Sequence, residues 1–382
     1  MKWFKFLCKP EVIYGVDSVF SLSEIIKKIK CRKILIVVDK FFSKTDKFTQ
    51  IKSIIEKEVD FVIFDKIEGE PTTEIGDECG NFGRENGCDA VIGIGGGSTL
   101  DTAKGASILI TNGGRIRDYQ GLDKVPSPGV PKIMVPTTAG TGSEVTFTAV
   151  FIRKDEKKKG GINSPYLYPE FAILDPSLTT TLPPDITAST GLDALCHAIE
   201  SFTSKKANFL TEIISLNAIK IIWRNLPVAY SNGNDLKARE NMLYGSFLAG
   251  IGLANAGVTA VHSISYPLGG RFGVPHGIGN GLLLPYVMEF NLPQITEKLG
   301  SLAKELNEEW KNLSVEDAAT KMVEEIKNFL EIFKIPRLKD LDIPVESFDG
   351  MAEDALKVSV PIKNNPRNIS KQDIIEIYRK AY

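Results

Sequence analysis

Short apolar runs alternate with longer amphipathic stretches through the first half of the chain. These runs are rich in β-branched residues, are bounded by charge, glycine or proline, and lie at residues 34–38, 61–64, 90–94 and 133–135. Such alternation is typical of a parallel sheet with crossover helices. Two more β-like runs, 147–152 and 171–174, flank the charged block 155–159, for which we predict an exposed turn.

The hydrophobic pattern changes after Pro183 and Pro184. From there almost to Tyr382, apolar residues recur at helical spacing, as they do in the segment 213–223. Prolines can begin a helix but are disfavoured in its interior. We therefore expect two domains, an α/β domain with a parallel sheet over residues 1–182 and an all-α domain over residues 183–382.

The composition is that of an ordinary globular protein, because 43% of the 382 residues are apolar and 25% are charged. The 46 Lys and Arg residues balance 48 Asp and Glu residues, which argues against nucleic acid or an acidic membrane as a partner. The five cysteines are odd in number and lack C-x-x-C spacing, so we expect reduced thiols. The apolar segment 1–10 is too short for a signal peptide or a membrane span. Together these features predict a cytoplasmic protein.

A glycine-rich turn follows the run at 90–94. Its three glycines, residues 95–97, lead into a helix that we expect to begin near Ser98. Glycines let the backbone approach an anion, and the start of a helix offers free N–H groups and a positive dipole end. Ser98 and Asp101 also resemble a capping box, in which Asp101 serves the helix rather than a ligand. The turn matches neither G-x-G-x-x-G nor the P-loop, so by itself it fits a nucleotide site and an ordinary strand-to-helix connection equally well.

A second loop, residues 136–144, follows the next strand, and its hydroxyl groups can contact phosphate or ribose at the same edge of the sheet. The alternative is a connection whose hydroxyls satisfy its own backbone. Asp39 closes the first predicted strand, where a carboxylate can bind a ribose hydroxyl and repel a 2′-phosphate, which favours NAD over NADP. A helix cap explains an acid at this position equally well.

The three histidines of the chain, His197, His262 and His276, all lie in one stretch of the helical half. Asp193 precedes His197 by four residues, so both side chains lie on one face of a helix and can hold the same ion. Glycines and Pro275 between the other two histidines permit a chain reversal that brings their imidazoles together. A single histidine is more often an ordinary core or surface residue, but three with a spaced aspartate favour a site for Zn²⁺, Fe²⁺, Co²⁺ or Ni²⁺.

The sequence resembles the iron-dependent, group III alcohol dehydrogenase family in a series of segments that occur in order along the chain. They are 12–15, 95–104, 136–144, 164–165, 175–176, 191–200, 255–270, 275–277 and 365–367. The resemblance implies a dehydroquinate synthase-like architecture, with NAD or NADP bound by the α/β half and Fe²⁺ or Zn²⁺ held where it meets the helical half. It implies these metal ligands: Asp193, His197, His262 and His276. It implies these cofactor contacts: Gly96, Gly97, Ser98, Asp101, Thr137, Thr138, Thr141 and Lys159.

Two positions depart from the family pattern. Many members carry a further histidine, a candidate proton relay, where this chain has Tyr266, four residues after His262. A phenol can pass a proton but titrates at far higher pH, so Tyr266 can act through water, shape the pocket or indicate a different substrate. The family's Asn-Pro after the second strand is Glu70-Pro71 here, which alters a contact on the adenine side.

The resemblance implies an NAD(P)-dependent alcohol dehydrogenase, in which the metal acts as Lewis acid on the oxygen of a small alcohol or aldehyde. One alternative is a reductase of a charged aldehyde or hydroxy acid, such as a phosphonate or carboxylate, for which Arg271 is a candidate unless it is an ordinary surface residue. Others are a dehydroquinate synthase-like lyase and, less favoured, a nucleotide and metal sensor. We expect a homodimer or higher homo-oligomer, in which the segment 11–14 pairs across copies.

Overall fold

The computed structural model describes residues 3–382 and contains two compact units. We call the first the α/β unit; it contains residues 7–182 and 233–247. We call the second the helical unit; it contains the described residues up to Phe6, residues 183–232 and residues 248–382. The chain passes from one unit to the other after residue 182, but the hydrophobic pattern does not indicate the return of 233–247 to the α/β unit.

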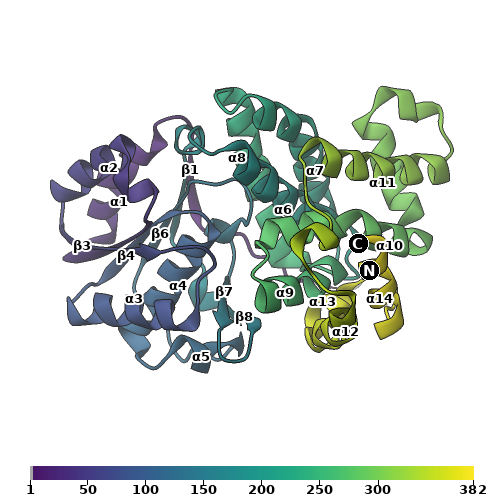
Figure 1. The fold of residues 1–382 in the computed structure, drawn as a ribbon. Coiled ribbons are helices and arrows are strands. Elements are labelled where there is room, and N and C mark those ends of the chain that lie inside the picture. The colour runs from purple at the N-terminus through teal and green to yellow at the C-terminus, as the bar shows by residue number, and fades with distance from the viewer. Residues whose placement is uncertain (1–2) are drawn as a thin grey trace. The chain divides into compact units, whose positions relative to one another are not determined.

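A six-stranded sheet forms the centre of the α/β unit, and every pair of neighbouring strands in it is parallel (Figure 1). In spatial order its strands are β1 (Glu11–Tyr14), β9 (Phe171–Leu174), β6 (Lys132–Pro136), β4 (Ala90–Gly95), β2 (Lys33–Asp39) and β3 (Asp60–Ile67). The four apolar runs of the first half all form strands of this sheet. The predicted parallel α/β fold is therefore confirmed.

Helices cover both faces of the sheet (Figure 1). They are α1 (Leu22–Ile29), α2 (Asp46–Glu56), α3 (Thr73–Glu85) and α4 (Gly97–Asn112); the short α5 (Ile116–Tyr119) follows α4 and shares an apolar cluster with its end. Along β2, Ile34 and Ile36 share a buried cluster with residues of α1 and α2, whereas Leu35 and Val37 share one with residues of α3 and α4. Because the central strands are buried on both faces, their sequences are continuously apolar rather than alternating.

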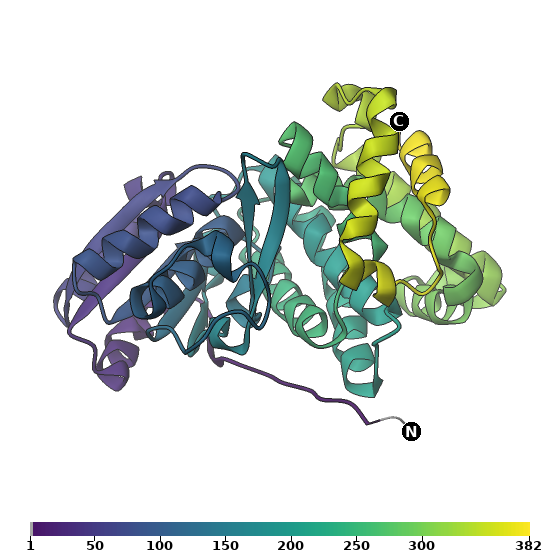
Figure 2. The ribbon, with the colours of Figure 1, turned by 90° about the horizontal axis from the view of Figure 1, so that it is seen from below.

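A second, smaller sheet is formed by β5 (Gly121–Leu122), β8 (Lys158–Asn163) and β7 (Thr148–Arg153), in that order. Strands β7 and β8 form an antiparallel hairpin that packs against α4, with Phe151 and Ile162 in a shared apolar cluster (Figure 2). The expectation of an exposed turn at 155–159 is only partly correct. The turn occupies 154–157, and Lys159 lies in β8 with its side chain only 7% exposed.

The second half of the chain is helical, as predicted. Its helices are α6 (Pro184–Thr203), α7 (Phe209–Ser231), α8 (Leu236–Ala256), α9 (Ala260–Phe272), α10 (His276–Leu306), α11 (Val315–Ile332), α12 (Phe348–Lys357), α13 (Ser359–Asn364) and α14 (Lys371–Lys380). Pro184 begins α6, in agreement with the sequence, but other prolines lie well inside longer helices. These are Pro227, Pro267, Pro285 and Pro293. Proline in this chain therefore marks helix ends only some of the time.

Short 3-10 helices connect several of these elements. They are η1 (Ser18–Ser21), η2 (Phe42–Lys44), η3 (Ser143–Val145), η4 (Pro165–Leu167), η5 (Pro176–Thr179), η6 (Glu308–Asn312), η7 (Leu338–Leu341) and η8 (Val345–Ser347).

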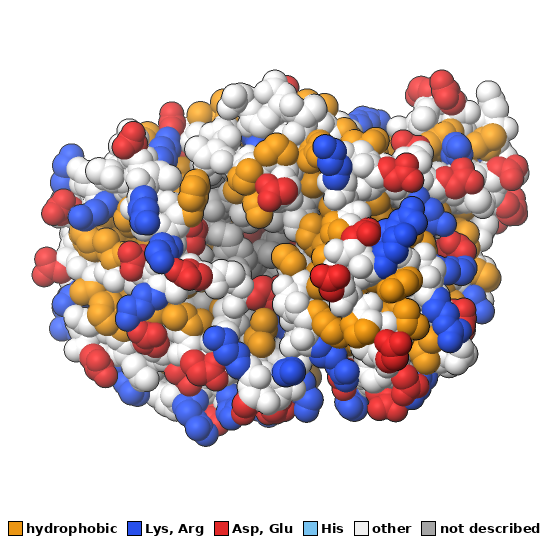
Figure 3. Space-filling model, in the orientation of Figure 1, with side chains coloured by type: hydrophobic (Ala, Val, Ile, Leu, Met, Phe, Trp, Pro, Cys, Tyr) orange, Lys and Arg blue, Asp and Glu red, His pale blue; other side chains and the backbone are white. Residues whose placement is uncertain are grey.

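Acidic and basic side chains are interspersed over the face drawn in Figure 3, in line with their nearly equal numbers. Within residues 3–382, a single helix with the length and apolarity to cross a bilayer is not found; α8 and α9 reach that apolarity only as a pair bent by 105°.

Candidate functional site

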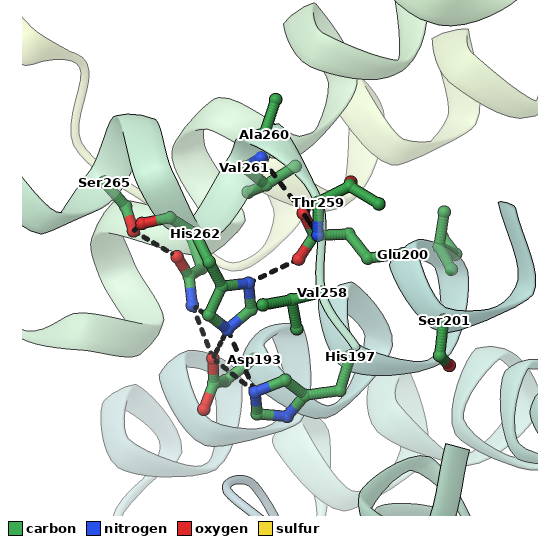
Figure 4. Close-up of polar contacts among 12 residues, drawn as sticks. Asp193, His197, Glu200, Ser201, Val258, Thr259, Ala260, Val261, His262 and Ser265 are labelled. Atoms are coloured by element: carbon green, nitrogen blue, oxygen red, sulfur yellow. Dashed lines mark hydrogen bonds and ion pairs between the residues drawn. The ribbon is translucent and has the colours of Figure 1, made fainter. Parts of the chain in front are cut away.

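Three helices of the helical unit bring the predicted metal ligands together. Asp193 and His197 lie one turn apart on α6, His262 lies in the first turn of α9, and His276 is the first residue of α10. Figure 4 shows the side chains of Asp193, His197 and His262 pointing toward one another. These three residues are at most 4% exposed, whereas the side chain of His276 is 22% exposed. The site is therefore closed on most sides and reachable at His276.

The start of α10 lies against α6 because its second residue, Gly277, is a glycine. A Cβ atom on Gly277 would lie 2.2 Å from the carbonyl oxygen of Ser189 in α6, so only glycine permits this approach. The contact places His276 beside Asp193. The reversal between α9 and α10 is confined to residues 273–275, which is shorter than the glycine spacing indicates, because Gly269 and Gly270 lie inside α9.

The donor atoms are close enough to share one cation. The Oδ1 atom of Asp193 lies 3.9 Å from Nε2 of His197, 4.0 Å from Nε2 of His262 and 3.9 Å from Nε2 of His276. Since metal–ligand bonds to these atoms are about 2.0–2.2 Å long, two ligands of one ion can be about 4.2 Å apart. Donor atoms of Asp193, His262 and His276 all lie within 4.8 Å of one another. His197 stands beside this group, with its Nε2 3.0 Å from that of His262.

The electrostatics of the cluster also suit a cation. Burial raises the pKa of Asp193, but the imidazoles of His197, His276 and His262 and a hydrogen bond from Asn280 outweigh burial and lower it to about 2. Asp193 is therefore ionised at neutral pH. One carboxylate among imidazole nitrogens is a donor set that fits Fe²⁺ or Zn²⁺ better than the oxygen-seeking Ca²⁺ or Mg²⁺.

Two residues that the sequence reasoning did not assign contact these groups. The amide nitrogen of Asn280 donates to Oδ1 of Asp193 at 2.7 Å and lies 3.1 Å from Nε2 of both His262 and His276. The carboxylate of Glu200 contacts Nδ1 of His262. A helical periodicity could have found both, because Glu200 follows Asp193 by two turns on α6 and Asn280 follows His276 by one turn on α10.

The two predicted nucleotide loops lie side by side at the carboxyl edge of the sheet. Strands β4 and β6 pair in parallel with Gly95 opposite Pro136, and the N–H of Thr137 donates to the carbonyl of Gly95 at 3.0 Å. A Cβ on Gly96 would lie 3.3 Å from Cγ2 of Thr138. The first turn of α4, which contains Ser98, therefore directs its backbone N–H groups beside the threonine loop, an arrangement suited to an anion.

Asp101 does not cap the helix. Helix α4 begins at Gly97 with Gly96 as its N-cap and has no side-chain cap. The carboxylate of Asp101 instead accepts hydrogen bonds from the hydroxyl of Ser143 at 2.6 Å and from the N–H of Val150 at 2.8 Å. Asp101 thus ties α4 to the second loop and to β7, and the capping-box interpretation is wrong.

Lys104, to which the sequence analysis assigned no role, reinforces this connection. It is fully buried one turn after Asp101, and its ammonium group lies 3.4 Å from that carboxylate. It donates to the carbonyl of Ser143 at 2.9 Å and to the hydroxyl of Thr146 at 3.3 Å. Burial lowers the pKa of Lys104, while Asp101 opposes the shift. The lysine therefore fixes the end of the threonine loop from inside the unit.

Asp39 and Lys159 are both engaged within the protein. The Oδ1 atom of Asp39 accepts hydrogen bonds from the N–H groups of Phe41 at 3.0 Å and Phe42 at 2.8 Å, so it caps the turn after β2. The ammonium group of Lys159 forms an ion pair with Glu70 at 2.9 Å. Glu70, which replaces the asparagine of the family's Asn-Pro, is thus the ion-pair partner of Lys159, a predicted cofactor contact.

The two remaining candidates lie on α9. The ring centroid of Tyr266 lies 5.9 Å from that of His276, which places the tyrosine beside the predicted metal ligands. Arg271 donates through Nε to Asp354 at 2.9 Å and through Nη2 to the carbonyl of Gly350 at 3.0 Å. These contacts account for Arg271 as a link between α9 and α12.

Comparisons with known proteins cover the chain almost from end to end. The family model described as "Iron-containing alcohol dehydrogenase" matches residues 9–176, and that described as "Fe-containing alcohol dehydrogenase family, C-terminal" matches residues 187–382. The chain is 37% identical to the NAD-dependent methanol dehydrogenase of Bacillus methanolicus over 98% of its own length and 99% of that protein. It is 36% identical to the 1,3-propanediol dehydrogenase of Citrobacter freundii over 100% and 99% of the two chains. A solved structure of a 1,3-propanediol oxidoreductase superposes over the whole of both chains with a TM-score of 0.96 at 35% identity.

Proposed function

Because the chain belongs to the iron-containing alcohol dehydrogenase family, we propose that it catalyses reversible hydride transfer between a small alcohol and NAD. The observation that carries the proposal is the convergence of Asp193, His262 and His276, whose donor atoms lie within 4.8 Å of one another. Fold alone does not define an activity, but a metal-binding constellation at the positions that the family resemblance indicates supports this one.

We assign the metal to Asp193, His262 and His276, with His197 as the fourth ligand. A divalent metal held there, Fe²⁺ or Zn²⁺, supplies Lewis acidity to the substrate oxygen. The chain contributes a preformed site: Asp193 is ionised before any ligand arrives, and its carboxylate is held by Asn280. Burial of the donors excludes competing water, which strengthens their attraction for a cation.

The α/β unit supplies the nucleotide site in this proposal. The N–H groups at the start of α4 bind the pyrophosphate, and Thr137, Thr138 and Thr141 contact the phosphates or the nicotinamide ribose. Asp39 brings a carboxylate to the end of β2 on the same edge, which favours an unphosphorylated ribose and therefore NAD. The nicotinamide supplies the hydride chemistry, and the protein contributes position.

The substrate in this proposal is an uncharged small alcohol or its aldehyde. Arg271 is engaged by Asp354 and Gly350, which removes the basis for a charged head group recognised by this residue. Tyr266 lies beside His276, where its hydroxyl can pass a proton between the substrate oxygen and water. We also propose that the protein is a homo-oligomer that pairs through β1, the edge strand of the sheet.

The test uses purified protein stripped of metal and reconstituted with Fe²⁺ or Zn²⁺. Short alcohols, diols, aldehydes and charged aldehydes are supplied with NAD(H) or NADP(H), and absorbance of the reduced nicotinamide is followed. We expect turnover with uncharged alcohols that depends on added metal. Full activity in the stripped protein contradicts the metal role. A dehydroquinate synthase-like lyase would release no net NADH, and a sensor would show no turnover at all.

A further inference from the structure

We propose that Glu200 is a positioning residue of the metal site, which fixes the tautomer and ring orientation of His262 so that Nε2 is available to the metal. The inference rests on the proposed function, since it concerns the same site. Glu200 lies on α6, three residues after His197, and is 2% exposed. A carboxylate buried to this extent must be satisfied by protein groups, so its partners reveal its task.

The two oxygens of this carboxylate have different partners (Figure 4). Oε1 accepts from the backbone N–H of Thr259 at 2.9 Å, from the Thr259 hydroxyl at 2.7 Å and from the N–H of Val261 at 3.0 Å. Oε2 contacts Nδ1 of His262. Because Thr259 is the N-cap of α9 and provides no side-chain cap, Glu200 is also the anion that this helix N-terminus attracts.

These contacts set the tautomer of His262. An ionised carboxylate accepts hydrogen bonds at both oxygens, so Nδ1 of His262 carries the proton that it donates to Oε2. The other nitrogen, Nε2, then carries the lone pair, and it is this atom that lies 4.0 Å from Oδ1 of Asp193. A carboxylate behind a metal-binding imidazole fixes the ring and increases its basicity.

The isosteric change Glu200→Gln separates the two tasks of the side chain. A glutamine amide has one accepting oxygen and one donating NH₂ group. The three donors of Thr259 and Val261 keep the amide oxygen on their side, so the NH₂ group faces His262 and donates to Nδ1. Nδ1 must then be unprotonated, and the proton moves to Nε2, the nitrogen that the metal needs. The variant keeps the helix cap but inverts the tautomer.

The first experiment needs no metal. The whole protein is labelled with ¹⁵N in histidine, of which the chain has three, and the ring nitrogens are observed by NMR in metal-free solution. His262 is assigned by its disappearance in His262→Asn. We expect the Nδ1–H tautomer for His262 in the wild type and the Nε2–H tautomer in Glu200→Gln. A purely structural helix cap would leave the tautomer unchanged.

The second experiment measures affinity for Co²⁺ and Zn²⁺ by competition with a chelator, together with the visible spectrum of the Co²⁺ form. We expect Glu200→Gln to bind both metals about 10–100-fold more weakly, as is typical when the hydrogen-bond partner of a ligand is lost. Thr259→Val removes one donor to Oε1 but leaves the His262 contact, and Glu212→Gln removes an acid that pairs with Lys298 elsewhere in the helical unit. Both controls should retain wild-type affinity and the wild-type Co²⁺ spectrum.

The outcomes distinguish this inference from the proposed function. Equal metal affinity and an unchanged His262 tautomer in Glu200→Gln overturn the inference. A wild-type protein that binds no metal at these residues refutes the proposed function, whereas the NMR experiment still tests the tautomer. If Glu200→Gln fails to fold, the wild-type spectrum decides, because an Nε2–H tautomer of His262 there contradicts the role of Glu200.

Discussion

A methyl group at Gly97 has no room, and Gly97→Ala therefore tests the contact between the two loops of the proposed nucleotide site. A Cβ built at this position lies 2.4 Å from Cγ2, 2.8 Å from Oγ1 and 3.0 Å from Cβ of Thr141. Rotation about χ1 of Thr141 relieves only part of the clash, because its Cβ, 3.0 Å away, does not move with this rotation. The loop 136–144 must move away from the glycine turn.

The magnitude follows from two opposing effects. Overpacking at a tight contact costs about 1–3 kcal/mol. Alanine recovers at most about 1 kcal/mol through its higher helix propensity, since residue 97 is the first residue of α4. We expect the free energy of unfolding of the α/β unit to fall by about 1–2 kcal/mol. Because the same movement displaces Thr137 and Thr138, we expect NAD to bind about tenfold more weakly.

The assay is urea denaturation for stability and calorimetric titration with NAD⁺ for affinity. For the stability measurement alone, Gly96→Ala is the matched control, because its nearest neighbour, Cγ2 of Thr138, would be 3.3 Å away and its backbone φ of −73° suits alanine. The double variant Gly97→Ala, Thr141→Ala removes two of the three clashing atoms. The Gly97→Ala change should therefore cost less stability and less NAD affinity in the Thr141→Ala background than in the wild type. The reasoning is refuted if Gly97→Ala matches the wild type, or if the double variant recovers nothing.

Four further outcomes are expected. Asp39→Asn keeps an acceptor for the turn after β2 but removes the charge, so the ratio of NADP to NAD activity should rise about tenfold. An unchanged ratio in initial-rate measurements would show that Asp39 does not distinguish NAD from NADP. Tyr266→Phe should lower kcat about 100-fold with unchanged metal content if the phenol passes a proton, and an unchanged kcat assigns the residue to packing. Burial raises the pKa of Glu144 to about 7 despite a backbone hydrogen bond and a nearby lysine. The native state thus keeps a proton that the unfolded chain releases near pH 4.5, so this stability is present at low pH and is lost as the pH rises through 7. Glu144→Gln should therefore gain up to about 3 kcal/mol relative to wild type as the pH rises from about 4.5 to 7, and a constant difference in denaturation experiments over this range contradicts this. Arg271→Gln should leave KM for charged aldehydes unchanged, whereas a selective rise in KM would restore the charged-substrate alternative.

The parts of the fold that sequence predicts well are those set by local burial. Strands such as β2 and β4 are apolar throughout because helices cover both of their faces, and this produces the runs that mark a parallel sheet. The turn at 155–159 is misjudged because charge alone predicts exposure. Lys159 is covered by its ion pair with Glu70, a partner 89 residues away in the chain.

The candidate site likewise contains residues that local sequence patterns predict and residues whose roles depend on distant partners. Asp193 and His197 can be found from their spacing on one helix, and the other two histidines from their scarcity. The tasks of Glu200 and Lys104 depend on partners that are distant in sequence, such as Thr259, 59 residues after Glu200. A repeating pattern in the sequence does not predict such pairs, because they form only when separate elements pack together. The capping-box interpretation of Asp101 fails for this reason, since its partner Ser143 lies on the loop 136–144, 42 residues further along the chain.

The origin of the proposed metal donors on three separate helices has a thermodynamic consequence. An ion bound by Asp193, His262 and His276 crosslinks α6, α9 and α10, and the unfolded chain offers no comparable binding site. Linkage then adds about 4 kcal/mol to the stability of the folded state when the free ion is a thousandfold above its dissociation constant. The melting temperature of the helical unit should accordingly follow the concentration of free metal in the solution, rising with each addition and falling with each equivalent of chelator.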